Sequence, residues 1–130
     1  MPEVMIGTSG WSYDDWEGIV YPKGRPARFD RMTYLAGFFD TLEVNSSFYR
    51  IPSARTTAGW ARRIEALPQF TFAMKLFRGL THDRVPQERD GLIREYREAV
   101  APLAEAGRLA AVLLQFPWSF RFTDENLDWL

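Results

Sequence analysis

The sequence has no cysteine, one histidine and almost no net charge, and each scarcity excludes a class of protein. Without cysteine there is no disulfide framework, no thiolate metal site and no cysteine nucleophile. Sixteen Lys and Arg against seventeen Asp and Glu give a net charge of −1, which argues against extended nucleic-acid binding. No apolar run approaches the ~18 residues of a membrane helix, and the chain starts without a signal peptide. We therefore expect a soluble, cytoplasmic protein with no membrane contact.

Four short apolar runs predict β-strands. Hydrophobic residues make up 46% of the 130 residues and charged residues 25%, a composition typical of one globular domain. The predicted strands are Glu3 to Thr8, Thr41 to Asn45, Phe70 to Lys75 and Leu109 to Phe116. Runs of this kind are typical of parallel strands, which are buried on both faces.

Segments with helical periodicity alternate with these strands. Apolar stripes predict one helix over 29–39, a second that Ser53 opens and whose stripe covers 60–67, and a third over 92–103, and a fourth helix begins near Thr123. Ser53 and Thr123 are expected to be N-caps. Gly107 is expected to end the third helix, and Pro102 to kink it or end it early.

The alternation of strand and helix predicts an α/β fold with a parallel sheet. We interpret residues 1–130 as the first four β/α units of a TIM (β/α)8-type barrel, the N-terminal half of a single truncated domain, because a complete barrel needs ~250 residues. The alternative is a small flavodoxin-like sheet that ends in a short helix. Half a barrel has two open sheet edges, so the isolated fragment is expected to self-associate or pack poorly.

Polar side chains gather where the predicted strands end. If the bulky residues face the helices, strand alternation turns Glu43, Asn45, Lys75 and Gln115 toward the barrel interior. Active sites of such barrels lie at this end of the strands. We expect Glu43 to be a general base or metal ligand, and Lys75 an electrostatic partner for an anionic or carbonyl group. The alternative is a structural ion pair between Glu43 and Lys75.

The loops after the strands add further candidates. His82, the one histidine, is expected to act as a proton shuttle or metal ligand, or else to be an ordinary hydrogen-bonded loop residue. The residues expected to bind a substrate are Ser9, Trp11, Tyr13, Asn45, Tyr49 and Gln115. The aromatic residues are suited to stacking on a sugar or base, and equally to packing the loop. A divalent metal is a candidate cofactor, but Glu43, Asn45 and His82 alone do not complete a ligand set.

The motifs at the strand ends resemble those of one family when taken together. Gly7-Thr8-Ser9-Gly10-Trp11-Ser12-Tyr13 and Glu43-Val44-Asn45-Ser46-Ser47-Phe48-Tyr49 are followed by Phe72-Ala73-Met74-Lys75, Thr81-His82 and Leu113-Leu114-Gln115-Phe116-Pro117. In this order they resemble the YecE-like family (domain of unknown function seventy-two). The resemblance implies a TIM barrel whose pattern continues past Leu130, with a later acidic residue, an Arg-His pair and a Trp. It implies no settled reaction.

Three functions are compatible with these features. The first is an enzyme that acts on a small polar substrate, phosphorylated or sugar-like, by acid–base or metal-assisted chemistry. The second is a non-catalytic module that binds a small ligand, a nucleotide or a nucleic-acid end, with Arg50, Arg78 and Arg84 as anion contacts. The third is a fragment without a function of its own. We expect Glu43→Gln to separate the first two.

Overall fold

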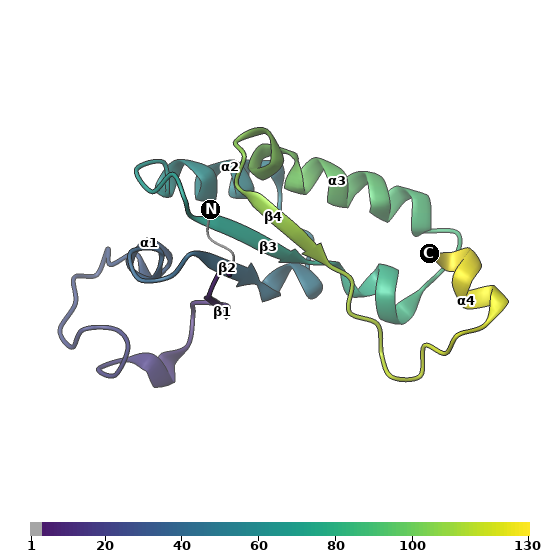
Figure 1. Ribbon diagram of the computed structural model, residues 1–130, viewed down its shortest axis with the longest axis horizontal. Coiled ribbons are helices and arrows are strands. Elements are labelled where there is room, and N and C mark those ends of the chain that lie inside the picture. The colour runs from purple at the N-terminus through teal and green to yellow at the C-terminus, as the bar shows by residue number, and fades with distance from the viewer. Residues whose placement is uncertain (1–3) are drawn as a thin grey trace.

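A four-stranded parallel sheet organises the chain. The structure, a computed structural model, describes residues 4–130. Its strands are β1 (Gly7–Ser9), β2 (Thr41–Val44), β3 (Thr71–Lys75) and β4 (Leu109–Leu113), and they lie side by side in the order of the sequence (Figure 1). A flavodoxin-like sheet reverses its strand order at a switch point. The consecutive order of β1 to β4 therefore contradicts the flavodoxin-like alternative.

The predicted strands exist, but their ends differ. Glu3 lies outside the described residues, and β1 is the short stretch Gly7–Ser9. Asn45 is not on β2, because it begins the 3-10 helix η2 (Asn45–Phe48). β4 ends at Leu113, whose carbonyl accepts the Leu76 amide at 2.9 Å. β3 ends at Lys75, which pairs with Leu113, so the apolar residues after Leu113 have no partner on β3 with which to extend β4.

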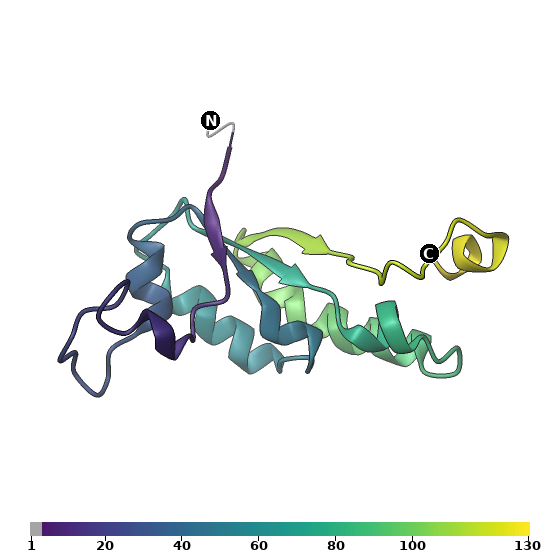
Figure 2. The same ribbon diagram turned by 90° about the horizontal axis from the view of Figure 1, so that it is seen from below.

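Three helices lie on one side of the sheet, and a fourth lies beyond its end (Figure 2). The three are α1 (Arg31–Ala36), α2 (Ala54–Arg63) and α3 (Arg89–Glu105), and the fourth is α4 (Asp124–Trp129). The predicted caps are confirmed: Ser53 and Thr123 each accept the amide three residues on at 3.2 Å. No helix within residues 4–130 is long and apolar enough to cross a membrane.

Of the two effects expected of Pro102, a kink or an early end of the third helix, the early end is wrong, since α3 continues to Glu105, and the kink stays a prediction. Pro102 lies in the last turn, where its missing amide costs a single helical hydrogen bond. Gly107 follows with φ +67°, the left-handed conformation that commonly follows a helix end.

The two faces of the sheet differ, as the alternation predicts. The side chains of Leu42, Val44, Phe72 and Met74 are at most 1% exposed and face the helices. Their packing partners are Met32 and Leu35 of α1, Trp60 and Ile64 of α2, and Tyr96 and Leu103 of α3. The other face carries the half-buried side chains of Thr41, Glu43, Thr71, Ala73 and Lys75. The alternation of β2 and β3 thus separates an apolar core from a polar face.

Asp30 joins α1 to α2, a contact that the sequence did not reveal. Its carboxylate accepts the amides of Met32 and Thr33 at 3.1 and 3.3 Å and pairs with Arg63 of α2. Partial burial acts to raise the pKa of Asp30, but hydrogen bonds from Arg63 and Thr33 outweigh it and lower the pKa to about 2. The ionised carboxylate therefore stabilises the folded state.

We expect the free energy of unfolding to fall in acid through Asp30. Its folded-state pKa is about 2, below the ordinary 3.8, so its contribution is complete above pH 4 and is lost as the pH falls toward 2. Asp30→Asn should therefore destabilise the protein at pH 6, and the difference from the parent should shrink by pH 2.5. Urea unfolding at both pH values measures it, with exposed Asp15→Asn as the control. A difference independent of pH would contradict this assignment.

Candidate functional site

Glu43 and Lys75 lie at the C-terminal ends of neighbouring strands and on the same face of the sheet. The Ser9 hydroxyl donates to Glu43 Oε1 at 2.8 Å, so β1 orients the carboxylate. The five ion pairs found within residues 4–130 do not include one between Glu43 and Lys75. The structural ion pair considered above is therefore not formed, and both charges remain open to a ligand.

The backbone carbonyl of Lys75 accepts hydrogen bonds from side chains of η2 and α3, which hold this residue in place. Its carbonyl accepts the Ser47 hydroxyl at 2.5 Å and the Tyr96 hydroxyl at 3.1 Å. Burial raises the pKa of Tyr96, so this hydroxyl remains protonated and able to donate. On the opposite face the Lys75 ammonium lies 4.8 Å from the centre of the Phe48 ring. The ring attracts the cation through its quadrupole without neutralising it.

Phe48 also contacts His82, which places all three residues in one group. The two rings meet edge to face, with centres 5.0 Å apart. His82 lies on a π-helical turn, η3 (Gly79–Asp83), and its Nδ1 is 2.8 Å from the Thr81 hydroxyl. The neighbouring Asp83 pairs with Arg78 at 3.1 Å rather than with the imidazole. Sequence reasoning did not single out Phe48, because an aromatic residue after a strand is usually core.

A pocket of about 310 Å³ lies between the segments that follow β1 and β2, and we call it the aromatic pocket. It is lined by Gly10, Trp11, Ser12, Tyr13, Asn45, Ser46 and Tyr49. Four of the six residues expected to bind a substrate thus come together. A fifth, Ser9, joins the pocket to Glu43, since its carbonyl accepts the Tyr13 hydroxyl at 2.5 Å while its own hydroxyl binds Glu43. Gln115 is exposed beyond the end of β4 and does not line this pocket.

The loop between β1 and α1 is packed, which fixes the pocket wall. Tyr21 is 1% exposed and donates to the carbonyl of Trp11, a residue that lines the pocket, at 2.5 Å. Trp11 itself meets Trp60 edge to face at 5.6 Å. Glu17 pairs with Arg25 and Arg31, and the hydrogen bond from Arg25 lowers its pKa although partial burial opposes this. Among the aromatic residues of this loop, Tyr21 is therefore packed in the core, whereas Trp11 and Tyr13 line the aromatic pocket.

A metal centre finds little support in these residues. Residues 4–130 bring together no group of three or more His, Asp or Glu side chains that is able to hold a metal ion. The chemistry of this part of the chain is that of one carboxylate, one ammonium and one imidazole.

Solved structures share this fold. A crystal structure of a DUF72 protein from Enterococcus faecalis superposes with a TM-score of 0.72 at 24% identity, over 95% of this chain and 43% of that one. One from Thermotoga maritima gives 0.68 at 29% identity, over 96% and 48%. These likenesses agree with the parallel α/β fold.

Sequence relatives point the same way. The protein YunF of Bacillus subtilis is 30% identical over 131 residues, which span 98% of this chain and 44% of YunF. YecE of Escherichia coli K12 is 24% identical over 117 residues, 90% of this chain and 39% of YecE. The chain thus spans less than half the length of these relatives. The model of the family described as "Protein of unknown function DUF72" matches residues 5–130, and this chain belongs to that family.

Proposed function

We propose that this chain is the N-terminal half of a cytoplasmic (β/α)8-barrel enzyme that acts on a small, polar, phosphorylated or sugar-like substrate. The observation that carries the proposal is the unpaired state of Glu43 and Lys75 at the carboxyl ends of adjacent parallel strands. Active sites of barrel enzymes lie at that end. Half-buried charges that do not neutralise each other are suited to binding and chemistry.

The barrel is supported by the sheet and by the chain's share of its relatives. Strands in consecutive order, with α1 to α3 on one side, are the arrangement of a (β/α) barrel. The polar face would then line the barrel interior. β1 and β4 would pair with strands from the rest of the protein, and an isolated fragment would self-associate through the same edges.

The proposed chemistry assigns a role to each group. Glu43 accepts a proton from the substrate, because a carboxylate held by a single hydroxyl donor keeps free lone pairs. Lys75 stabilises the negative oxygen of the substrate or its phosphate. His82 is placed to exchange a proton near the ammonium, since both contact Phe48. The aromatic pocket holds the sugar ring against Trp11, Tyr13 or Tyr49, with Asn45 as a hydrogen-bonding partner.

The non-catalytic binding module receives less support. It relied on Arg50, Arg78 and Arg84 as anion contacts and on aromatic side chains for stacking, and the aromatic pocket would provide the stacking to an enzyme equally. Arg78 pairs with Asp83, and Arg84 donates to Asn126 Oδ1 at 2.6 Å. Arg50 is exposed and lines a neighbouring surface hollow, so its role as an anion contact stays a prediction. The enzyme is therefore the function that we favour.

The proposal is tested by the binding of two probes to the full-length protein, glucose 6-phosphate and glucose. Lys75→Gln should weaken glucose 6-phosphate by about tenfold or more, because a hydrogen bond to a charged group contributes about 1.5–3 kcal/mol. Glucose should bind almost as before. Calorimetric titration measures both affinities, with exposed Lys23→Gln as the control. Equal losses for both probes, or none, would contradict the role of Lys75.

A further inference from the structure

We propose that Asn126 and Trp129 of α4 are positioning residues that hold His82 against Phe48. The importance of His82 rests on the proposed function, but the positioning is a separate claim about the structure. It starts from an unusual segment. His82 lies on the π-helical turn η3, and Arg84 follows with φ +48°, in the left-handed region that only glycine adopts readily. Such conformations persist where surrounding contacts hold them.

The first contact holds the end of the turn. The Arg84 guanidinium donates to Asn126 Oδ1 at 2.6 Å and lies 4.8 Å from the centre of the Phe120 ring. Asn126 is itself oriented, because its amide donates to the Arg121 carbonyl at 2.7 Å. The left-handed residue is thus fixed by a side chain 42 positions later in the sequence.

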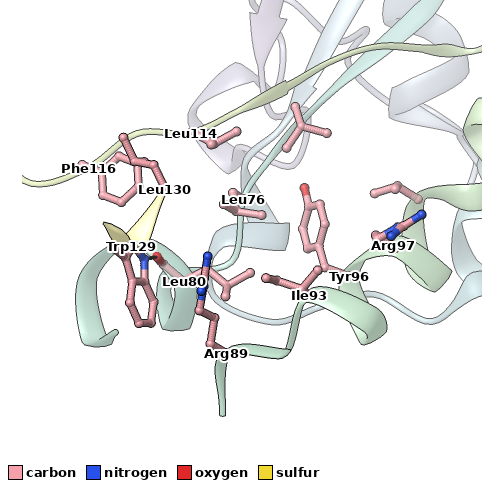
Figure 3. A pocket seen from close by; sticks show the side chains of 12 residues that line it. Leu76, Leu80, Arg89, Ile93, Tyr96, Arg97, Leu114, Phe116, Trp129 and Leu130 are labelled. Atoms are coloured by element: carbon pink, nitrogen blue, oxygen red, sulfur yellow. Dashed lines mark hydrogen bonds between the residues drawn. The ribbon is translucent and has the colours of Figure 1, made fainter. Parts of the chain in front are cut away.

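The second contact holds the start of the turn. The Trp129 indole N–H donates to the Leu80 carbonyl at 2.7 Å, and the Arg89 guanidinium lies 5.3 Å from a Trp129 ring centre. Figure 3 shows Trp129 beside Leu80, with Arg89 next to them, at one end of an apolar pocket. Leu80 is 4% exposed, so its carbonyl has a specific partner where little water reaches.

The two contacts bracket His82, since Leu80 and Arg84 each lie two residues from it. His82 is exposed, and its imidazole contacts the Thr81 hydroxyl within the turn and the Phe48 ring on η2. A turn released at either end is free to adopt ordinary helical geometry, which rotates the residue between. We therefore infer that α4 sets the direction of the imidazole.

The test measures the place of His82 directly, by NMR on the full-length protein. The imidazole signals are assigned by their loss in His82→Gln, and a nuclear Overhauser effect reports contact with the Phe48 ring. Asn126→Leu and Trp129→Phe should each shift the imidazole signals and weaken or abolish that effect. Asn126→Asp keeps an oxygen that accepts from Arg84 but loses the amide that donates to the Arg121 carbonyl, and it should retain more of the effect than Asn126→Leu. Exposed Asp128→Asn on the same helix is the control and should leave it unchanged.

Each outcome decides. An unchanged Phe48 contact in both Asn126→Leu and Trp129→Phe overturns the inference. If Asn126→Leu fails to fold, Trp129→Phe and Asn126→Asp carry the test, because both changes are small. The affinity for glucose 6-phosphate should fall in step with the loss of contact, by about two- to tenfold, the effect of one net hydrogen bond. A parent protein that binds no glucose 6-phosphate would refute that ligand and leave the NMR result valid.

Discussion

Glu43→Gln should slow the turnover of a substrate by about 10²- to 10⁴-fold and leave its binding nearly unchanged, because this is the range contributed by a positioned general base. Glutamine has the same length and retains an oxygen that accepts the Ser9 hydroxyl, a bond of 2.8 Å in the parent. The substitution therefore preserves the local packing. It removes the ability to take up a proton near neutral pH.

The measurement follows a panel of sugar phosphates, incubated with the full-length protein, by ³¹P and ¹H NMR. The compound that the parent consumes is then used for rates and for calorimetric binding with the variant. Exposed Glu65→Gln on the helical side is the matched control and should keep the parental rate. A rate within threefold of the parent would remove Glu43 from the chemistry. A changed affinity with no turnover in the parent would favour the binding module.

Periodicity and alternation predicted the features that repeat along the chain. The four strands and four helices depend on where apolar residues recur, and burial in the sheet follows the same rule. Because Leu42 and Val44 are buried against helices, Glu43 between them must face the other way. The neighbourhood of Glu43 and Lys75 followed from this reasoning, as did the caps at Ser53 and Thr123.

Apart from the early helix end expected at Pro102, the errors lie where the chain leaves its regular elements. Asn45 and Gln115 were placed on strands because the apolar pattern extends to them, but a strand continues only while a neighbour supplies hydrogen bonds. The π-helical turn under His82 has no periodicity of its own. It depends on Asn126 and Trp129, more than 40 positions away, a contact that local sequence does not encode.

Gly7→Ala should destabilise the protein by about 3 kcal/mol, the upper end of the usual cost of inserting a methyl group into a packed site. A Cβ at position 7 would lie 1.9 Å from the Thr41 carbonyl oxygen, well inside contact distance. That oxygen belongs to the backbone of β2, so only a separation of β1 from β2 relieves the overlap. The pairing of Ser9 with Glu43 lies in the same ladder and should loosen as well.

The same chemical change in α2 provides the control for Gly7→Ala. At Gly59 the nearest atom to an added Cβ is an Arg62 nitrogen at 3.9 Å, an ordinary contact, and the residue lies in the helix interior. Gly59→Ala should stabilise the protein by about 0.5–1 kcal/mol through helix propensity alone. Urea unfolding of both variants therefore distinguishes a steric requirement from a general effect of alanine. If both variants gain stability, β1 does not approach β2 as closely as the structure places it, and the orientation of Glu43 by Ser9 loses its support.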